Sequence, residues 1–421
     1  MERICVIGLG YIGLPTAAFL ANSGYKVYGM DINNELVDKI NSCKVPFVEK
    51  GLNDLVTRSV KTGNLTVQTK IHDADVYFIC VPTPFTKNKK ADLTYVVSAT
   101  KSILPKIKKG NMVILESTVP PLTTKNIVGP ILEKSGLHVG RDISLCHCPE
   151  RVMPGNIINE MINNDRVIGG VDRKSTLRAL KIYKKFVKGR IFLTDDTTAE
   201  YVKLIENTFR AVNIALANEL ALIAEKVGIN AMEAINLANK HPRVDIHNPG
   251  PGVGGHCIPV DPWFVVETAG GTSKLIPLAL TINESMPEHV VNLLTDALKE
   301  AGKSLKKSKV VVLGAAYKGN AEDTRESPTT PIVAKLLKAR TKHVVIYDPY
   351  VTKYEYPIEH NFSKAVKGAD ALIVVTDHNE FKRMNMSDVK KLMAPKPILV
   401  DSRNIVKNHN GFIFRGIGIG R

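Results

Sequence analysis

A chain of 421 residues is too long to fold around one ordinary hydrophobic core, so two or three domains are expected. Its 44% hydrophobic and 23% charged residues are typical of a soluble globular protein, and no run of about 18 apolar residues predicts a membrane span. The formal net charge of +16 comes from scattered lysines, which favours anionic small molecules such as nucleotides over nucleic acid, because no basic-aromatic motif accompanies the charge.

The six cysteines show no pairing pattern and predict reduced thiols in the cytoplasm. Cys5 and Cys80 lie in apolar runs and are interpreted as small core residues. Cys146-His147-Cys148 lacks the second pair of ligands that a zinc site needs, so no metal is expected. The chain enters a strand at Arg3, which leaves no room for a signal peptide.

Residues 1–195 alternate short β-rich runs with amphipathic segments. This βαβ alternation predicts a doubly wound parallel sheet, that is, a Rossmann-like domain. The expected strands are Arg3–Gly8, Tyr25–Met30, Val76–Val81, Met112–Ser117 and Ile143–His147.

A glycine-rich hexapeptide, Gly8-Leu9-Gly10-Tyr11-Ile12-Gly13, follows the first strand and opens an apolar helix. Its glycines permit a tight turn and let a pyrophosphate approach the helix N-terminus, where free N–H groups favour anions. Asp31 follows the second strand at the distance at which a carboxylate binds ribose hydroxyls, and it would repel a 2′-phosphate. The pattern predicts NAD rather than NADP. The alternative is a glycine-rich turn in an ordinary βαβ unit.

Three further turns follow strand ends, which form the ligand-binding edge of a doubly wound sheet. They are Val81-Pro82-Thr83-Pro84, Glu116-Ser117-Thr118-Val119-Pro120 and Cys146-His147-Cys148-Pro149-Glu150-Arg151. A hydroxyl at Thr118 could hold a water near the nicotinamide, and Thr83 is a second candidate contact to the cofactor. Each turn taken singly is also compatible with a plain strand exit.

One long helical pattern begins at Thr197 and runs to about Val227. Thr197-Thr198-Ala199-Glu200 is typical of an N-terminal cap, and Gly228 closes the run. The apolar residues that cover much of the helix are Val202, Ile205, Phe209, Val212 and Leu216. We therefore expect this helix to be largely buried.

A polar stripe lies on the same helix, with Lys203, Asn207 and Arg210 at i, i+4 and i+7 on one face. A buried Lys–Asn pair suits an alkoxide or oxyanion, because it directs a cation and an amide donor at developing negative charge. The alternative is a solvated stripe on an amphipathic helix.

A long glycine- and proline-rich loop, from His241 to Pro262, interrupts the helical region and indicates function. It contains Gly252-Val253-Gly254-Gly255-His256-Cys257-Ile258-Pro259-Val260-Asp261. In a nicotinamide enzyme, a thiol such as that of Cys257 can trap an aldehyde, and the adduct can be oxidised to a thioester and hydrolysed. Arg243 offers a planar fork of donors for a phosphate. For a lone cysteine the alternative is a buried structural residue.

Strand–helix alternation returns after Lys303. The expected strands are Val310–Gly314, His343–Tyr347, Ala371–Thr376 and Pro397–Val400. Basic residues that could face phosphates follow the first and last of these, in Tyr317-Lys318-Gly319, Asp323-Thr324-Arg325-Glu326-Ser327-Pro328 and Asp401-Ser402-Arg403. The alternative is charged loops that cap helices. The predicted fold is α/β, with two Rossmann-like doubly wound domains, 1–195 and 303–421, joined by a central helical region, 196–302, that contains a long helix.

These motifs, in this order, resemble the nucleotide-sugar 6-dehydrogenase family, which includes UDP-glucose and GDP-mannose dehydrogenases. The resemblance runs from Ile4 to about Arg403. It is carried by Gly8–Gly13, Glu116–Pro120, Pro149-Glu150-Arg151, Lys203-x-x-x-Asn207, Gly254–Asp261 and Lys318 with Arg325-Glu326-Ser327. It implies that the C6 alcohol of a UDP-sugar is oxidised twice, with two NAD reduced per acid formed.

The resemblance also implies a role for individual residues. Cys257 would be the nucleophile, and Lys203 and Asn207 would stabilise oxyanions, with Lys203 also able to shuttle a proton. Asp261, Thr118 and Glu150 would position or activate the hydrolytic water, and which of them is the base stays open. The residues implied to contact the cofactor are Gly8, Gly10, Tyr11, Ile12, Gly13, Asp31, Thr83, Thr118 and Arg325. Those implied to contact the UDP-sugar are Glu150, Arg151, Val152, Lys203, Asn207, Arg210, His241, Arg243, His247, Gly254, Tyr317, Lys318 and Arg403.

Members of the family usually dimerise through the central helices, with a loop arginine completing the partner's sugar site. Arg243 occupies that position, so a homodimer or higher homo-oligomer is expected. The loop departs from the UDP-glucose enzymes, which commonly have Phe-Pro-Lys-Asp where this chain has Ile258-Pro259-Val260-Asp261. The segments His241–His247 and Pro262-Trp263-Phe264 resemble the branch acting on UDP-N-acetylhexosamines. They imply the manno epimer, with the gluco epimer as the alternative.

Two other classes of protein are compatible with part of the sequence. A single-hydride hydroxyacid or phosphogluconate-type dehydrogenase also has Lys and Asn at i, i+4, but it needs neither the cysteine nor a second nucleotide-binding domain. It would form one NADH per substrate instead of two. A basic NAD-sensing or nucleic-acid-binding protein would show salt-sensitive nucleic-acid binding and no NAD reduction.

Overall fold

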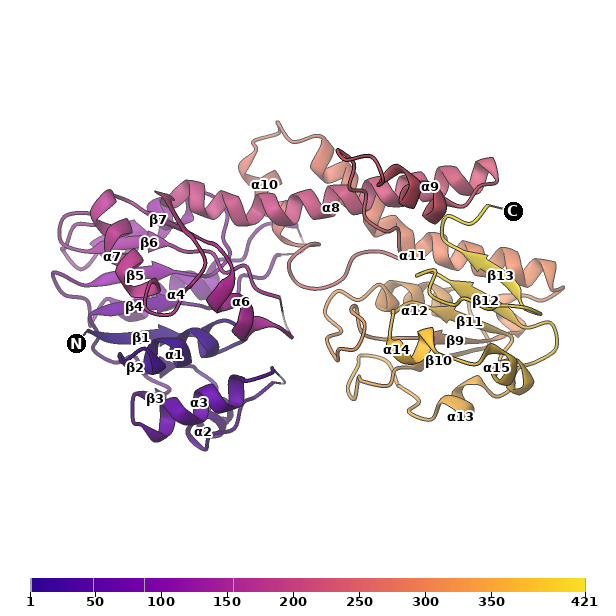
Figure 1. The fold of residues 1–421 in the computed structure, drawn as a ribbon, viewed down its shortest axis with the longest axis horizontal. Coiled ribbons are helices and arrows are strands. Elements are labelled where there is room, and N and C mark those ends of the chain that lie inside the picture. The colour runs from indigo at the N-terminus through magenta and orange to yellow at the C-terminus, as the bar shows by residue number, and fades with distance from the viewer. Residues whose placement is uncertain (1, 48, 87, 154, 421) are drawn as a thin grey trace. The chain divides into compact units, whose positions relative to one another are not determined.

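The computed structural model describes residues 2–47, 49–86, 88–153 and 155–420. Contacts between residues divide the chain into two compact units (Figure 1). The first contains Met1–Glu206 and Trp263–Gly270, and the second contains Asn207–Pro262 and Gly271–Arg421. The domain boundaries expected at 195/196 and 302/303 stay a prediction.

The first unit is built on an eight-stranded sheet with the order β3-β2-β1-β4-β5-β6-β7-β8. Neighbouring strands are parallel except β6 and β7, which are antiparallel. The strands are β1 (Arg3–Ile7), β2 (Lys26–Met30), β3 (Leu65–Gln68), β4 (Val76–Ile79), β5 (Met112–Leu115), β6 (Ser144–His147), β7 (Arg166–Gly170) and β8 (Ile191–Asp195). The doubly wound sheet is confirmed, and β3, β7 and β8 are additional to the five strands that the sequence predicted.

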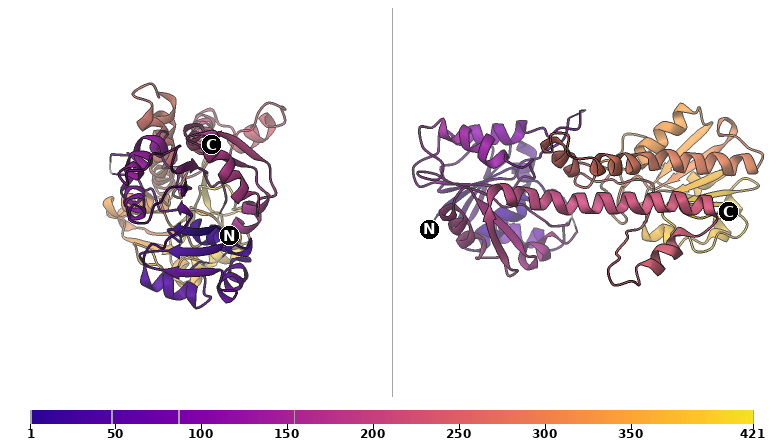
Figure 2. Two further views of the ribbon diagram at one scale, coloured as in Figure 1. Left: turned by 90° about the vertical axis from the view of Figure 1, so that its left-hand side faces the viewer. Right: turned by 90° about the horizontal axis from the view of Figure 1, so that it is seen from above.

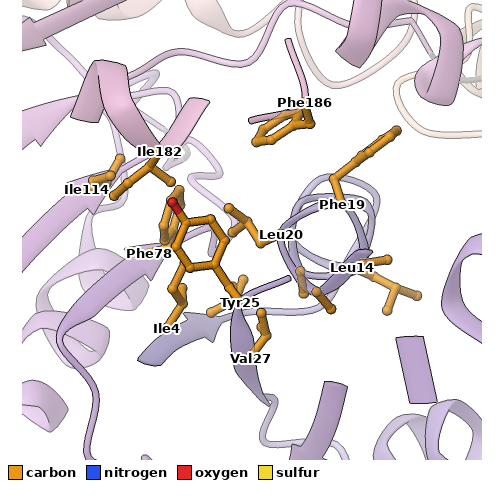
Figure 3. Close-up of a cluster of buried hydrophobic side chains, with 14 of the residues drawn as sticks. Ile4, Leu14, Phe19, Leu20, Tyr25, Val27, Phe78, Ile114, Ile182 and Phe186 are labelled. Atoms are coloured by element: carbon orange, nitrogen blue, oxygen red, sulfur yellow. The ribbon is translucent and has the colours of Figure 1, made fainter. Parts of the chain in front are cut away.

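Helices connect these strands and cover the sheet. They are α1 (Gly13–Asn22), α2 (Asn34–Asn41), α3 (Leu52–Lys61), α4 (Thr94–Ile103), the π-helical turn η1 (Thr124–Val128), α5 (Gly129–Glu133), α6 (Ile157–Asn163), α7 (Arg173–Tyr183) and, from Trp263 onward, α10 (Asp261–Thr268). On β1, Ile4 and Val6 join one buried cluster, whereas Cys5 and Ile7 join another. Burial on both faces is expected for a parallel strand that has helices on either side. Figure 3 shows the first of these clusters.

Helix α8 spans Asp196–Val227, close to the predicted bounds. Its first turn is capped by Asp195, whose Oδ1 accepts a hydrogen bond from the Thr198 amide at 2.9 Å. The predicted capping by Thr197-Thr198-Ala199-Glu200 is therefore wrong. The Glu200 carboxylate instead accepts hydrogen bonds from the amides of Leu122 and Thr124, each at 2.7 Å.

The expectation that α8 is largely buried is also wrong for one of its faces. Phe209 is 57% exposed. The large apolar residues of α8 that are exposed are Tyr201, Ile205, Phe209, Leu216, Ile223 and Val227. At 100° per residue, their spacing puts all six within one narrow stripe along the helix. An apolar residue pattern predicts a face that avoids water, but it does not say that the same chain covers that face.

The second unit contains a five-stranded parallel sheet with the order β10-β9-β11-β12-β13. The strands are β9 (Lys309–Leu313), β10 (His343–Tyr347), β11 (Ala371–Val374), β12 (Ile398–Asp401) and β13 (Ile413–Gly416). The helices are α9 (Ala231–Ala238), α11 (Leu275–Glu300), the 3₁₀ turn η2 (Leu305–Lys307), α12 (Thr329–Lys338), α13 (Phe362–Val366), α14 (Asn379–Lys382) and α15 (Met386–Leu392). The second Rossmann-like sheet is confirmed, and β13 is additional to the prediction.

In the second unit, the C-terminal part of α8 runs beside α11 (Figure 2). Asn218 Nδ2 donates to Asn283 Oδ1 at 2.9 Å, and Asn283 Nδ2 donates to the Ala211 carbonyl at 2.9 Å. Both asparagines are buried, so these bonds satisfy amides that would otherwise be costly to remove from water. Asn218 Oδ1 also accepts from the Gly250 amide at 2.8 Å, which attaches the loop before Cys257 to the same pair of helices.

Candidate active site

The loop between β1 and α1 has its shape imposed by two of its glycines. Gly8 has φ +88°, and a Cβ on it would lie 2.9 Å from the Cys80 carbonyl oxygen. A Cβ on Gly13 would lie 1.8 Å from the Gly8 carbonyl oxygen, so no other residue fits there. A Cβ on Gly10 would meet no heavy atom within 4 Å. The loop therefore leaves an open approach at Gly10, in front of the N-terminus of α1, where a pyrophosphate fits.

Asp31, directly after β2, stabilises this loop through hydrogen bonds. Its Oδ2 accepts a hydrogen bond from the Leu9 amide at 2.9 Å, and its Oδ1 accepts from the Asn33 amide at 3.0 Å. The ring of Tyr11, inside the glycine-rich hexapeptide, stacks on Phe47 with 4.3 Å between ring centroids. The direct contacts of Asp31, Tyr11 and Ile12 with a cofactor stay a prediction.

The turns after β4 and β5 meet, as expected for neighbouring parallel strands. The Thr83 hydroxyl donates to the Thr118 carbonyl at 2.6 Å, and the Ser117 hydroxyl donates to the Val81 carbonyl at 2.7 Å. Thr83 and Thr118 therefore lie together at the carboxyl edge of the sheet. Thr83 uses its hydroxyl hydrogen within the protein, so any contact it makes with a cofactor would use its oxygen as an acceptor.

Glu150, in the turn after β6, is paired with a residue that the sequence analysis missed. Arg166 Nη2 donates to Glu150 Oε2 at 2.7 Å, and both side chains are buried. Arg151 points elsewhere, donating to Glu206 of α8 and to the Asp165 carbonyl. Val152 packs against the apolar core of the first unit. A contact of Val152 with substrate stays a prediction.

Asn207 and Asp261, which lie far apart in the sequence, are adjacent in the second unit. Asn207 Nδ2 donates to Asp261 Oδ2 at 2.6 Å, and both residues are buried. The Asp261 amide donates to the Cys257 carbonyl at 2.8 Å, which closes a turn directly before α10. The structure therefore brings Cys257, Asp261 and Asn207 into one arrangement. Lys203, one turn earlier on α8, is half-buried and belongs to the first unit.

The cysteine loop rests on Tyr317, which follows β9. A Cβ on Gly254 would lie 2.4 Å from the Tyr317 Cβ, and one on Gly255, which has φ +88°, would lie 3.0 Å from the Tyr317 ring. The Gly255 amide donates to the Arg325 carbonyl at 2.9 Å. Burial raises the pKa of Asp323, the residue two before Arg325, but the hydrogen bond from the Arg325 guanidinium outweighs burial and lowers this pKa. Glycines at 254 and 255 are therefore required for the loop to approach this part of the second unit.

The remaining predicted substrate residues are distributed over the second unit. Arg403 is half-buried and its Nε donates to the Val375 carbonyl at 2.8 Å. Arg243 is exposed and approaches His241, and His247 makes an edge-on ring contact with Phe209. Arg210 is exposed and Lys318 is half-buried.

No group of three or more His, Cys, Asp or Glu side chains among the described residues could hold a metal ion. No helix in the part of the chain that is described is long and apolar enough to cross a membrane.

Models of three domains match the chain in consecutive segments. Residues 2–187 match the NAD binding domain of the UDP-glucose/GDP-mannose dehydrogenase family, residues 197–285 its central domain and residues 311–408 its UDP binding domain. The chain belongs to the UDP-glucose/GDP-mannose dehydrogenase family. It is an NAD-dependent dehydrogenase, and the resemblance stated from the sequence is confirmed.

Three members of the family show how close the likeness is. The chain is 48% identical to the UDP-N-acetyl-D-mannosamine dehydrogenase of Methanococcus aeolicus, over 100% of this chain and 96% of the relative. The structure matches the UDP-D-ManNAc dehydrogenase of Pyrococcus horikoshii with a TM-score of 0.95 at 46% identity, over 99% of both chains. It matches the UDP-N-acetyl-mannosamine dehydrogenase of S. aureus with a TM-score of 0.90 at 42% identity, also over 99% of both chains.

The candidate residues are distributed over the three domains of the family. The NAD binding domain contains the glycine loop, Asp31, Thr83 and Thr118. The UDP binding domain contains Tyr317 and Arg403, together with Lys318 and Arg325. The central domain contains the polar residues of α8 and the cysteine loop. The cofactor is NAD, and the predicted contact of Arg325 with it stays a prediction.

Proposed function

We propose that this enzyme oxidises the C6 alcohol of UDP-N-acetyl-D-mannosamine to UDP-N-acetyl-D-mannosaminuronate. The observation that carries the proposal is the buried hydrogen bond between Asn207 and Asp261 beside the backbone of Cys257, because it groups an amide donor, a carboxylate and a thiol. The substrate is supported by relatives of this name that match over the whole chain. The corresponding oxidation of UDP-N-acetylglucosamine is the alternative.

The reaction needs two oxidations and one hydrolysis. NAD held at the Gly8–Gly13 loop would supply the acceptor for the hydride that leaves C6 in each oxidation. The alcohol first becomes an aldehyde, and the Cys257 thiolate adds to it to give a thiohemiacetal. Loss of the second hydride gives a thioester, and water then displaces the thiol to release the acid. One alcohol, two NAD⁺ and one water thus give one carboxylate, two NADH and three protons.

Five further side chains have distinct proposed roles. The ammonium of Lys203 and the amide of Asn207 stabilise the oxygen anion that forms as C6 is oxidised and attacked. The amide nitrogen of Asn207 carries two hydrogens, so one can bind Asp261 while the other serves the substrate oxygen. Asp261, Thr118 and Glu150 position or activate the water that hydrolyses the thioester.

Recognition of the UDP-sugar is proposed for residues of all three segments. Tyr317, Lys318 and Arg403 serve the UDP portion, which is supported by their place in the UDP binding domain. The residues proposed to contact the remainder of the substrate are Glu150, Arg151, Val152, Lys203, Asn207, Arg210, His241, Arg243, His247 and Gly254.

We also propose that the enzyme forms a homodimer through α8. The exposed apolar stripe of this helix supports the proposal, because patches of this kind on a folded chain mark interaction sites. The exposed Arg243 is then available to complete the sugar site of the partner. Leu216→Glu should yield a monomer in light-scattering measurements, whereas a dimer that survives this change would contradict the assignment of the surface. We propose a cytoplasmic location for the enzyme, which is supported by its six free cysteines.

The covalent step is tested by replacing the nucleophile. Cys257→Ser should abolish acid formation, because a serine hydroxyl is a far poorer nucleophile near neutral pH. Cys43→Ser is the matched control, since Cys43 lies outside the site and is also half-buried. Acid formation at the wild-type rate in Cys257→Ser would exclude the covalent mechanism.

The substrate is tested with a panel of UDP-N-acetylmannosamine, UDP-N-acetylglucosamine, UDP-glucose and GDP-mannose. We expect kcat/KM to favour the first over UDP-glucose by at least about 10²-fold, because a site that pairs polar groups with an amide rejects analogues without one. Two NADH should form per acid. One NADH per substrate would indicate a single-hydride dehydrogenase, and a preference for UDP-N-acetylglucosamine would overturn only the epimer.

A further inference from the structure

The first unit contains a buried ion pair that closes around Glu150. Glu150 is 8% exposed and Arg166, the first residue of β7, is 3% exposed. Removing two charges from water costs several kcal/mol for each unless they are well paired. Glu150 Oε2 accepts from Arg166 Nη2 at 2.7 Å, and its Oε1 accepts from the Arg151 amide at 2.8 Å. Both oxygens of the carboxylate are therefore held by donors of the protein.

Arg166 is itself fixed in place by aromatic rings and by its strand. Its guanidinium carbon lies 5.2 Å from the ring centroid of Tyr183 and 5.8 Å from that of Phe186. Its amide donates to the Arg190 carbonyl at 2.8 Å, within the pairing of β7 and β8. Its Nε and Nη1 have no hydrogen-bond partner among the described residues. Glu150 is therefore the only described group to which this guanidinium donates a hydrogen bond.

A second buried carboxylate, Glu116, makes its hydrogen bonds with other groups. Glu116 Oε1 accepts from the Tyr183 hydroxyl at 2.5 Å, and its Oε2 accepts from the Thr16 hydroxyl at 3.0 Å and the Cys80 thiol at 3.2 Å. Burial, together with the charge of Glu150, raises the pKa of Glu116. The charge of Arg166 opposes this rise, but its guanidinium donates its hydrogen bond to Glu150.

We infer that Arg166 is a positioning residue for thioester hydrolysis, holding the Glu150 carboxylate in one orientation. The inference rests on the proposed function, in which Glu150 acts on the hydrolytic water. A carboxylate must be both charged and correctly directed to take a proton from water. Without Arg166, the buried Glu150 carboxylate would lose the partner of its Oε2 and would turn away from this position.

Three variants test this role. Arg166→Met removes the partner, Arg166→Lys keeps a charge without the planar fork, and the double variant Glu150→Gln with Arg166→Met replaces the pair by neutral groups of similar size. We expect kcat to fall by about 10-fold or more in each single variant, since a misplacement of about 1 Å can cost about 10²-fold. KM for NAD should change by less than about threefold.

The informative readout is the intermediate. Intact-protein mass spectrometry during turnover should detect an acyl adduct on Cys257 in the Arg166 variants, because both oxidations proceed and hydrolysis is slowed. The double variant should unfold at the wild-type temperature and still accumulate the adduct.

Several results would overturn the inference. A folded Arg166→Met with wild-type kcat and no adduct would do so, and so would full hydrolysis in the double variant. If Arg166→Met does not fold, wild-type hydrolysis in Arg166→Lys would have the same force. Glu150→Gln distinguishes the role of Glu150 from that of Arg166. If Glu150→Gln accumulates the adduct and the Arg166 variants do not, only the role of Arg166 is wrong. If wild type forms one NADH per substrate, the proposed function fails instead.

Discussion

Gly10 and Gly13 lie in the same loop, and the structure predicts opposite consequences for the same change at each. Around Gly10 the space within 4 Å of an added Cβ is empty, and its φ lies outside the left-handed region. Gly10→Ala should therefore fold normally, and its free energy of unfolding can rise by up to about 1 kcal/mol, because alanine restricts the unfolded chain. Its methyl group would instead fill the approach to the N-terminus of α1.

The magnitude of the effect on NAD follows from that overlap. Forcing a methyl group into an occupied space costs about 1–3 kcal/mol. At 1.4 kcal/mol for each factor of ten, NAD should bind to Gly10→Ala about 5- to 140-fold more weakly than to wild type. Isothermal titration calorimetry with NAD measures this directly, and the melting temperature of the same samples measures folding.

Gly13→Ala is the matched comparison. Its Cβ would lie 1.8 Å from the Gly8 carbonyl oxygen and 3.0 Å from the Cys80 Cβ, and the nearest obstacle is backbone. The loop must move, so Gly13→Ala should lower both the melting temperature and the affinity for NAD. Gly10→Ala with wild-type affinity, or with a melting temperature as low as that of Gly13→Ala, would refute the proposed approach of the cofactor.

Three further outcomes are expected from the described contacts. Burial raises the pKa of Asp348, but hydrogen bonds from His378 and from backbone amides outweigh it and lower this pKa to about 2. The shift contributes about 2 kcal/mol to the free energy of unfolding above about pH 4, and this contribution is lost as the pH falls toward 2. Acid unfolding of Asp348→Asn, followed by circular dichroism, should lack this pH-dependent loss of stability. Gly254→Ala should lower kcat by about 10²-fold, because its Cβ would meet Tyr317 at 2.4 Å and displace the cysteine loop, and steady-state kinetics with unchanged kcat would contradict this. Lys203→Ala should lower kcat by about 10²-fold with little change in melting temperature, whereas an effect confined to stability would favour a structural role.

Features set by neighbouring residues could be predicted from the sequence. The β1–α1 loop needs glycines at 8 and 13, and the spacing alone indicated them. The buried strands of both sheets were predicted because their apolar residues are contiguous. β7 was missed because its sequence, Arg-Val-Ile-Gly-Gly, begins with a charge and ends in glycines, both of which argue against a strand. Its glycines are explained by packing, since a Cβ on Gly169 would lie 2.0 Å from the Asp195 carbonyl oxygen.

Features that depend on distant partners could not be predicted. Arg166, at the start of β7, pairs with Glu150, which follows the neighbouring strand β6, and nothing in either local sequence indicates the partner. The capping of α8 by Asp195 was within reach, because an aspartate three residues before the Thr198 amide is a common N-cap, but the threonines beside it offered a competing pattern. The exposed stripe of α8 was missed for a different reason. Its residues were correctly read as apolar, but their environment depends on what covers the helix.

The position of α10 has a consequence for how the protein is made. Trp263–Gly270 belong to the first unit, although residues 207–262 of the second unit precede them. Lys89 lies 4.2 Å from the ring centroid of Trp263, and the Ala91 amide donates to Glu267 Oε2 across a separation of 176 residues. At about 5–20 residues per second, a ribosome needs roughly 10–35 s to deliver that partner after Ala91 has been added. The first unit therefore stays incomplete during translation until residues 207–262 of the second unit have been synthesised. For the same reason, cleavage of the chain at one site cannot separate the complete first unit from the second.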